Sequence, residues 1–162
     1  MKNGRKVVIE FLTEKAGKDD KVILIVGDVG FSFMEDYKQK FPKQFLNTGV
    51  LEQSMMGIAA GLANEGFKPY VYTMKNFILL RPIEQVRNNI GFANVNVKLL
   101  GVGGSEAYKF LGISHNLLKG EEEGMLEFIP NINSYLNPQS EDELKENLLK
   151  EYDRQGPAYF SI

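Results

Sequence analysis

The chemical group that the sequence singles out first is a carboxylate, that of Glu52. Counting three, four and seven residues on from Glu52 reaches Met55, Met56 and Ala59, so the carboxylate heads an otherwise apolar stripe of a predicted helix. Burial there favours a protonated carboxyl, whereas a helix N-terminus favours the charged form. Two interpretations stay open at this point: a functional buried acid, and an N-terminal glutamate that only stabilises its helix.

The rest of the sequence offers few reactive side chains. It contains no cysteine and a single histidine, His115, which excludes disulfides, thiolate nucleophiles and zinc sites built from Cys and His. Ser114 precedes His115, but GISHN is not a G-x-S-x-G nucleophile elbow. The segments GDVGFS and GVGGS match neither a dinucleotide nor a P-loop pattern. We expect the acidic triplet Glu121–Glu123 to be a solvated helix start. Chemistry therefore has to come from carboxylates, amides, hydroxyls, His115 or a borrowed cofactor.

Short apolar strands alternate regularly with helices along the chain. Amphipathic or capped segments predict helices over residues 5–16, 33–41, 51–66, 76–91, 121–130 and 140–156. Apolar runs predict strands over residues 21–28, 44–50, 68–74, 95–104, 132–137 and 157–162. This order predicts one α/β domain over residues 1–162, a parallel sheet with helices on both faces and with ligand groups in the loops at the carboxyl ends of the strands.

Two of these helices carry further signals. The helix over residues 51–66 ends at a C-cap glycine, Gly66, and its predicted stripe consists of Leu51, Met55, Ile58, Ala59 and Leu62. Its small residues would let another backbone approach closely, as a helix at a subunit interface needs. In the last helix Ser140 and Glu143 have the spacing of a capping box, and the predicted inward face consists of Leu144, Leu148 and Leu149.

Composition narrows the classes of partner. The 162 residues include 19 Lys and Arg against 21 Asp and Glu, a net charge of −2, and 43% are hydrophobic. Basic residues are scattered, so we expect no nucleic-acid partner. The longest apolar run is Val22–Val26, which is too short to span a membrane. The N-terminus does not read as a signal peptide, so we expect a cytoplasmic protein without a membrane partner.

Longer motifs resemble a known family. The chain is similar to the pyrimidine-binding domain of transketolases and 1-deoxyxylulose-phosphate synthases, particularly of split transketolases, in the stretch FPKQFLNTGVLEQSMMGIAAGLANEGFKPYVYTMKNF. The similarity continues through RPIEQVRNNIGFANVNVKLLGVGG, GISHN and IPNINSYLNPQSEDEL to GPAYFSI, so it covers nearly the whole chain in the family's order. It implies the thiamine diphosphate-binding fold and the transfer of a two-carbon ketol unit to an acceptor sugar.

The resemblance implies roles for residues at the cofactor. Glu52 in GVLEQ matches the glutamate that hydrogen-bonds the aminopyrimidine ring nitrogen of thiamine diphosphate. There a partly protonated carboxyl stabilises the imino tautomer of the ring, whose nitrogen takes the proton from the thiazolium carbon. Phe77 in KNF matches the aromatic residue stacked on the pyrimidine, and Met74 and Tyr72 are alternatives for that position. Phe77 can equally be a core aromatic residue.

The resemblance also implies residues that face the substrate. His115 in GISHN matches a histidine that lines the substrate channel and helps proton transfer around the donor's hydroxyls; the alternative is a structural turn residue. Ser32 and Asp28 in GDVGFS fall where transketolases contact substrate, and both can instead form the turn.

Three positions depart from the family pattern. Gly103 stands near the place of a phosphate-binding histidine, Leu111 replaces an acidic residue, and Glu127 replaces an arginine before IPN. We therefore expect an acceptor other than a simple sugar phosphate, such as a nucleotide-linked or unphosphorylated keto sugar.

The family's GDG…N motif, which holds the diphosphate through Mg²⁺, is absent from the sequence, as is the family's third domain. We expect the chain to be inactive alone and to pair with a diphosphate-binding transketolase subunit that holds most of the Mg²⁺ site, in a heterotetramer with the cofactor across the interface. Two alternatives stay open. One is a subunit of another two-chain thiamine diphosphate enzyme, of the 2-oxo acid decarboxylase or dehydrogenase type. The other is a non-catalytic, flavodoxin-like binding module.

Overall fold

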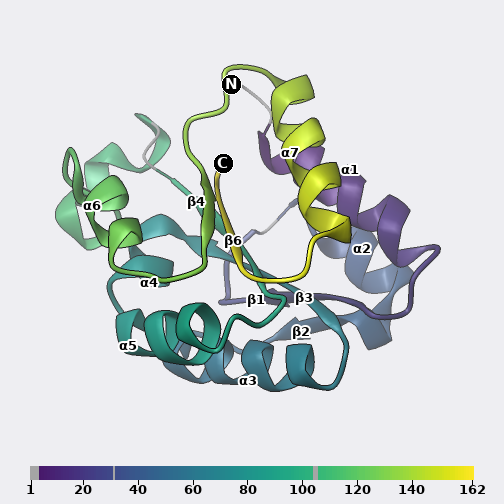
Figure 1. Cartoon of the computed structure of the whole chain (residues 1–162). Coiled ribbons are helices and arrows are strands. Elements are labelled where there is room, and N and C mark those ends of the chain that lie inside the picture. Colours follow the sequence, from purple (N-terminus) through teal and green to yellow (C-terminus); the bar gives the residue numbers. More distant parts are fainter. Residues whose placement is uncertain (1–3, 31, 104–105) are drawn as a thin grey trace.

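A six-stranded, all-parallel sheet forms the centre of the computed structural model, which describes residues 4–30, 32–103 and 106–162 (Figure 1). The strand order is β2-β1-β3-β4-β6-β5. The strands are β1 (Val22–Val26), β2 (Phe45–Asn47), β3 (Lys68–Met74), β4 (Lys98–Val102), β5 (Asn133–Tyr135) and β6 (Ala158–Ser161). Each lies inside a segment predicted to be a strand, so the α/β class and the parallel sheet are confirmed.

Helices cover both faces of this sheet (Figure 1). One face carries α1 (Gly4–Ala16), α2 (Glu35–Lys40) and α7 (Glu141–Asp153). The other carries α3 (Glu52–Asn64), α4 (Lys75–Leu79), α5 (Ile83–Gln85), the π-helical segment η2 (Val86–Phe92) and α6 (Glu121–Glu127). Two 3-10 segments, η1 (Pro42–Gln44) and η3 (Glu106–Ser114), complete the described chain, and η3 is kinked at Gly112.

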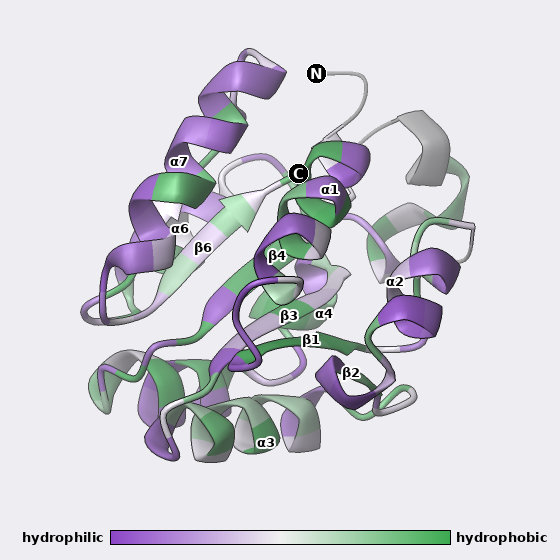
Figure 2. Ribbon diagram, turned by 90° about the vertical axis from the view of Figure 1, so that its right-hand side faces the viewer, coloured by the Kyte–Doolittle hydropathy of each residue, from purple (hydrophilic) through white to green (hydrophobic). Residues whose placement is uncertain are grey.

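Two hydrophobic clusters, one on each face, hold the layers together. All five residues of β1 and of β4 are buried, as expected for strands covered on both sides. Side chains alternate along β3, so that Tyr70 and Tyr72 pack with α1 and α7, whereas Val71 packs with Met55 and Met56 of α3. In Figure 2 hydrophobic and hydrophilic residues accordingly alternate along helices such as α1 and α7, as expected for helices with one face on a core. This packing sets the orientation of α3 on the sheet, and with it the position of Glu52, the first residue of α3.

The predicted helix over residues 76–91 is wrong as a single element. The chain forms α4, breaks at residues 80–82, and resumes as α5 and η2. Pro82 has no backbone N–H to donate and disfavours helical geometry in the residue before it, so the helix cannot run through this point. The break brings Arg81 into an exposed turn beside α3.

Three other expectations are corrected by tertiary packing. Leu149 is 42% exposed and does not belong to the inward face of α7, whereas Leu144 and Leu148 are fully buried. Within the acidic triplet, Glu122 is buried rather than solvated. In the predicted stripe of α3, Leu51 and Ile58 are exposed and the inward face runs through Met55, Met56, Ala59 and Ala60.

Helix ends follow their predicted signals. Ser140 precedes α7, and its side chain accepts a hydrogen bond from the Glu143 backbone N–H at 3.0 Å. The Glu143 carboxylate in turn accepts from the Gln139 backbone N–H at 2.7 Å, one residue before the expected partner. Gly66 follows the C-cap of α3 with φ of 81°, a conformation that glycine adopts without strain. The cap signals of α3 and α7 are therefore confirmed.

A partly buried and a buried ion pair connect elements at the amino-terminal edge of the sheet. Lys68 at the start of β3 contacts Asp19 at 2.9 Å, and the Tyr152 hydroxyl donates to the same carboxylate at 2.6 Å. Although burial opposes the charge, these hydrogen bonds lower the pKa of Asp19 to about 2. Lys98 at the start of β4 pairs with Glu151 of α7 at 3.3 Å, and burial lowers the pKa of Lys98 to about 8. The candidate site residues, beginning with Glu52, lie at the opposite, carboxyl edge of the sheet.

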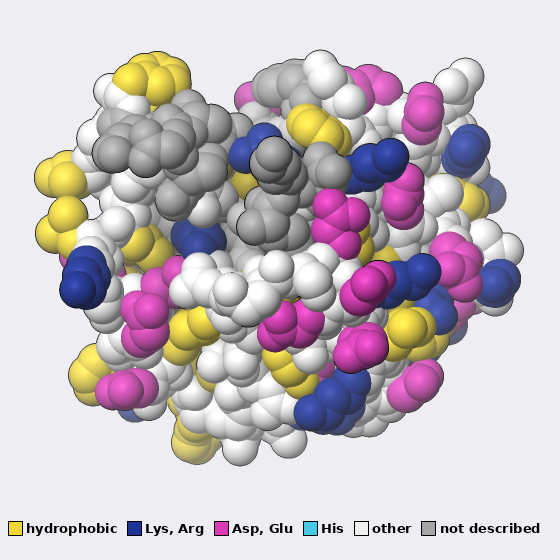
Figure 3. All heavy atoms as spheres, turned by 90° about the horizontal axis from the view of Figure 1, so that it is seen from above, with side chains coloured by type: hydrophobic (Ala, Val, Ile, Leu, Met, Phe, Trp, Pro, Cys, Tyr) yellow, Lys and Arg dark blue, Asp and Glu magenta, His cyan; other side chains and the backbone are white. Residues whose placement is uncertain are grey.

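The described surface has no strong bias toward one charge. Lys and Arg side chains are interspersed with Asp and Glu side chains on the face seen from above in Figure 3. No helix in the described ranges is long and apolar enough to cross a membrane.

Candidate active site at the carboxyl edge of the sheet

Glu52 is the first residue of α3, reached from β2 through a four-residue loop at the carboxyl edge. Its side chain is only 5% exposed, so the carboxylate is buried, as the first of the two interpretations left open by the sequence requires. It lies at a surface pocket of about 350 Å³ that is lined by Val50, Leu51, Glu52, Gln53, Ser54 and Arg81. The carboxylate thus sits at the head of a buried stripe and still borders a space open to a ligand.

Arg81 is the main partner of Glu52 in the described chain. Its Nη1 donates to Glu52 Oε1 at 2.6 Å, and Gln53 Nε2 donates to the Arg81 carbonyl oxygen at 3.4 Å. The same guanidinium lies over the ring of Phe77, with Cζ 3.5 Å from the ring centroid. Sequence reasoning missed Arg81; the signal that could have found it is a lone cation between the apolar run FILL and the helix-breaking Pro82.

Phe77 lies on α4 and is 7% exposed. One face of its ring is covered by Arg81, and its ring centroid lies 5.1 Å from that of His115 in an edge-to-face arrangement. The structure therefore brings three of the predicted residues into one group, with Glu52 and His115 on either side of the Arg81–Phe77 pair.

Ser114 orients the imidazole of His115. Ser114 Oγ donates to the Leu111 carbonyl oxygen at 2.7 Å and lies 2.8 Å from His115 Nδ1, a contact in which the donor depends on the tautomer of the ring. This contact holds the ring through Nδ1, and Nε2 is the nitrogen left to meet a substrate.

Asn76 joins α4 to the segment that carries His115. Its Nδ2 donates to the Ser114 carbonyl oxygen at 2.5 Å, while its buried Oδ1 has no hydrogen-bond partner among the described residues. Residues 76 and 77 are therefore positioned together with His115, even though they are separated from it by almost forty residues of sequence.

A buried polar network anchors the first residue of α4, Lys75. Lys75 Nζ donates to Glu122 Oε2 at 3.0 Å and to the hydroxyl of Ser161. Glu122 Oε1 accepts from the Tyr159 hydroxyl at 2.7 Å, and burial, with the adjacent Glu122 charge, raises the pKa of Tyr159. We call these four residues the Lys75 network. It connects α4, the helix that carries Phe77, to α6 and β6.

Tyr72 and Met74 are both buried in β3. Tyr72 belongs to the hydrophobic cluster on the face of α1 and α7. Met74 is the last residue of β3 and directly precedes α4. Its methyl lies 2.9 Å from where a Cβ would stand at Gly103, a position that is 4.0 Å from the His115 carbonyl oxygen. The structure therefore does not bring Tyr72 to Glu52, which is on the α3 side of the sheet.

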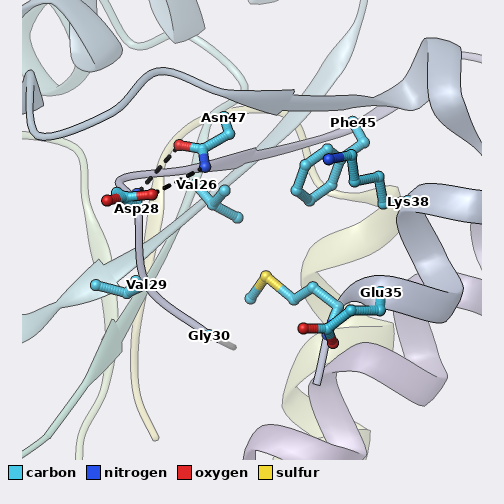
Figure 4. A pocket seen from close by; sticks show the side chains of 9 residues that line it. Val26, Asp28, Val29, Gly30, Glu35, Lys38, Phe45 and Asn47 are labelled. Atoms are coloured by element: carbon cyan, nitrogen blue, oxygen red, sulfur yellow. Dashed lines mark hydrogen bonds between the residues drawn. The ribbon is translucent and has the colours of Figure 1, made fainter. Parts of the chain in front are cut away.

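Asp28 and Ser32 lie on the loop after β1. Asp28 has φ of 54°, and its backbone N–H and carboxylate both bond the Asn47 side chain at 3.2 Å (Figure 4). This pair joins the loop after β1 to the last residue of β2. Asp28 lines a pocket of about 120 Å³ that shares no lining residue with the pocket at Glu52. Ser32 is exposed, with φ of 70°, and its backbone N–H donates to Glu35 at 2.8 Å.

Within the described ranges, no group of three or more His, Asp or Glu side chains is placed to hold a metal ion. The donor groups at the carboxyl edge are instead one buried carboxylate, one imidazole, one guanidinium and an aromatic ring. Such a set can bind and orient an organic ring and exchange protons with it.

Comparisons with known proteins show the family to which the chain is similar. A family model described as "Transketolase, pyrimidine binding domain" matches residues 1–162. An apulose-4-phosphate transketolase subunit of Phocaeicola vulgatus is 36% identical over 115 residues, which are 70% of this chain and 37% of the relative. The 6-deoxy-6-sulfo-D-fructose transketolase subunit SqwH of Clostridium sp. (strain MSTE9) is 27% identical over 159 residues, which are 98% and 48% of the two chains.

Among solved structures, a split-gene transketolase described as an inactive β4 tetramer superimposes with a TM-score of 0.84 at 28% identity, covering 98% of this chain and 50% of that chain. The chain thus spans half or less of the length of these relatives.

Proposed function

Because this chain belongs to the family of transketolase pyrimidine-binding domains, we propose that it forms the pyrimidine-binding part of a thiamine diphosphate-dependent transketolase. The observation that carries the proposal is the carboxylate of Glu52, which is 5% exposed at the first residue of α3 and borders a pocket at the carboxyl edge. A buried acid at the edge of a ligand pocket is what recognition of an aminopyrimidine ring nitrogen requires.

The residues present fit this group. A carboxyl at the pocket can share a proton with a ring nitrogen, and the neighbouring Phe77 supplies a flat apolar surface of the kind on which heteroaromatic rings stack. When bound, thiamine diphosphate supplies the carbanion chemistry that cleaves a ketose and transfers two of its carbons. The part of this chain is to bind, orient and exchange protons.

Individual residues take the following roles. Glu52 holds the ring nitrogen and sets the protonation of the ring, and Phe77 fixes the plane of the ring. His115, with Nδ1 held by Ser114, presents Nε2 as a base or hydrogen-bond acceptor for a hydroxyl of the sugar. Asp28, oriented by Asn47, and Ser32 on the same loop contact the sugar further from the reacting carbon.

A second chain completes the site. The relatives are subunits of transketolases, and one solved neighbour is described as a split-gene enzyme. We assign the diphosphate and Mg²⁺ to a partner chain that carries the GDG…N motif, and two copies of each chain form a heterotetramer. The cofactor then lies across the interface between the two kinds of chain.

The substrate class is a ketose donor with an acceptor other than a simple sugar phosphate. One relative is named for 6-deoxy-6-sulfo-D-fructose, which carries a sulfonate in place of a phosphate and agrees with this expectation. Another is named for apulose 4-phosphate, which is a sugar phosphate and does not agree with it. Gly103 near the place of a phosphate-binding histidine supports an acceptor that is nucleotide-linked or unphosphorylated. Efficient transfer between common pentose phosphates would contradict this part, and turnover of 2-oxo acids instead of ketoses would favour a decarboxylase or dehydrogenase subunit.

The decisive experiment replaces the carboxylate. Glu52→Gln is compared with Glu65→Gln, which changes an exposed glutamate at the far end of α3. After the partner chain is co-purified, proton exchange at the thiazolium carbon of thiamine diphosphate is followed by NMR. We expect exchange and turnover to be nearly abolished by Glu52→Gln and unchanged by Glu65→Gln, and each chain to be inactive alone. Unchanged exchange in Glu52→Gln, or full turnover by the isolated chain, would refute the proposal.

A further inference from the structure

The guanidinium of Arg81 makes two contacts at once in the free chain. It donates to the buried carboxylate of Glu52 at 2.6 Å, and it lies over Phe77 with Cζ 3.5 Å from the ring centroid. A guanidinium is planar, carries several N–H donors and stacks on aromatic rings. These are the two contacts that the proposed function gives to an aminopyrimidine: a hydrogen bond to Glu52 and a stacked position on Phe77.

The guanidinium of Arg81 and an aminopyrimidine cannot both bind Glu52 and stack on Phe77 at the same time. Phe77 is only 7% exposed with Arg81 over it, so no part of its ring large enough for stacking is open. The other side chain in ring contact with it, His115, meets it edge to face. Arg81 is the cover that can move, because its side chain is 41% exposed and lies in the turn that Pro82 creates between α4 and α5.

We propose that Arg81 occupies the pyrimidine position of the site in the partner-free chain, and that a ligand binds there only by displacing its guanidinium from Phe77 and Glu52. Arg81 is thereby a further residue of the site, one that sets its affinity by competition. This inference rests on the proposed function, since it assumes that the ligand is an aminopyrimidine. It adds that the chain blocks its own subsite until the ligand arrives.

The size of the effect follows from the contacts that are exchanged. A cation over an aromatic ring at a partly exposed site and an ion pair with one exposed partner are each worth at most about a few-fold in an equilibrium constant. Removal of the guanidinium should therefore tighten aminopyrimidine binding about fivefold. If Arg81 instead bound the aminopyrimidine directly, removing its guanidinium would weaken the binding.

The test uses 4-amino-5-hydroxymethyl-2-methylpyrimidine, which has the ring but neither thiazolium nor diphosphate and so reports on this subsite alone. Its affinity for the 162-residue chain is measured by NMR titration for the wild type, Arg81→Met, Arg81→Lys and Glu52→Gln. Arg87→Met is the matched control, because Arg87 is exposed and its guanidinium bonds the neighbouring Asn88, away from the site. In parallel, the guanidinium N–H signals of Arg81 are followed in labelled wild-type chain.

We expect Arg81→Met to bind the probe about fivefold more tightly, Arg81→Lys to be intermediate because a lysine lacks the planar fork, and Arg87→Met to match the wild type. The slowly exchanging Arg81 signals should disappear as the probe saturates the wild type. Equal or weaker binding by Arg81→Met, with Glu52→Gln still binding poorly, would overturn the inference and leave the proposed function intact. Failure of every variant to bind, or full binding by Glu52→Gln, would remove the proposed function and this inference with it.

Discussion

The Lys75 network offers the sharpest test of what stabilises the site, because Lys75 is the first residue of α4, the helix that carries Phe77. Lys75 Nζ is 3.0 Å from Glu122 Oε2, and both side chains are 11% exposed. Replacing Glu122 with Gln removes the charge and keeps an oxygen that can accept from the Tyr159 hydroxyl. The ammonium of Lys75 then stays buried beside the hydroxyl of Ser161, without a carboxylate to balance its charge.

The magnitude follows from the geometry of the pair. Unit charges 3.0 Å apart attract by about 5 kcal/mol at an effective dielectric constant of about 20. Removing one partner of such a buried pair lowers the free energy of unfolding by about 3–5 kcal/mol, because an uncompensated charge remains. We expect this loss for Glu122→Gln and for Lys75→Met separately. The double variant leaves no buried charge, so its loss should be only about 1–2 kcal/mol.

Urea unfolding at pH 7 followed by far-UV circular dichroism measures these differences, since the chain has no tryptophan. The m-values should agree among the variants, which would show that the stability of the folded state has changed rather than its compactness. The control is the exposed pair Lys6 and Glu10, 3.7 Å apart with side chains 67% and 66% exposed. Glu10→Gln should change stability by less than about 0.5 kcal/mol.

Two results would refute this reasoning. One is a loss below about 1 kcal/mol in each single variant, which would mean that the pair is solvated. The other is a double variant that loses as much as the two single variants together, which would mean that the two charges do not interact.

Three further predictions concern stability. Asp19→Asn should make the free energy of unfolding less dependent on pH in the acid range. The pKa of Asp19 in the folded chain, about 2, lies below the ordinary value of 3.8, so the contribution of the Asp19–Lys68 pair is complete above pH 4 and is lost as pH falls through 2. Urea unfolding of both chains from pH 5 to 2 measures this difference. Ser140→Ala should lower the unfolding free energy by about 1 kcal/mol, as loss of an N-cap does, and no change would mean that the cap bond is absent in solution. Gly101→Ala should cost about 3 kcal/mol because its Cβ would stand 2.9 Å from Cζ of the fully buried Tyr159; a melting temperature equal to that of the wild type would contradict the packing around β4.

Local signals in the sequence were sufficient for much of the fold. The continuous apolar run Val22–Val26 coincides with β1, because a strand covered on both faces has no polar side to alternate with. Ser140 and Gly66 mark helix ends through backbone hydrogen bonding and backbone conformation, which depend on neighbouring residues only. Helical spacing also placed Glu52 at the head of an apolar stripe, but it left open whether the carboxylate is buried or only stabilises its helix, and the structure shows it buried.

Packing between distant segments decided the rest. The triplet Glu121–Glu123 reads as a solvated helix start, yet Glu122 is buried because Lys75 and Tyr159, from α4 and β6, meet it. Leu149 has the spacing of an inward residue, yet it remains 42% exposed. For Leu149 the helical period does not say how wide a stripe the rest of the molecule covers. For Glu122 a run of acidic residues does not say which distant polar groups pack against it.

At the site itself, the sequence by itself determined which residue types were available: a carboxylate at the head of an apolar stripe, one histidine, and no side chains for thiolate or zinc chemistry. Only the tertiary structure decided that Phe77 lies beside His115, that Tyr72 faces away from Glu52, and that Arg81 fills the space between Glu52 and Phe77. The physical reason is that spacing along a strand or helix fixes the direction of a side chain within its own element. The neighbour it meets is set by the order of strands in the sheet and by the break at Pro82, which bring residues tens of positions apart into contact.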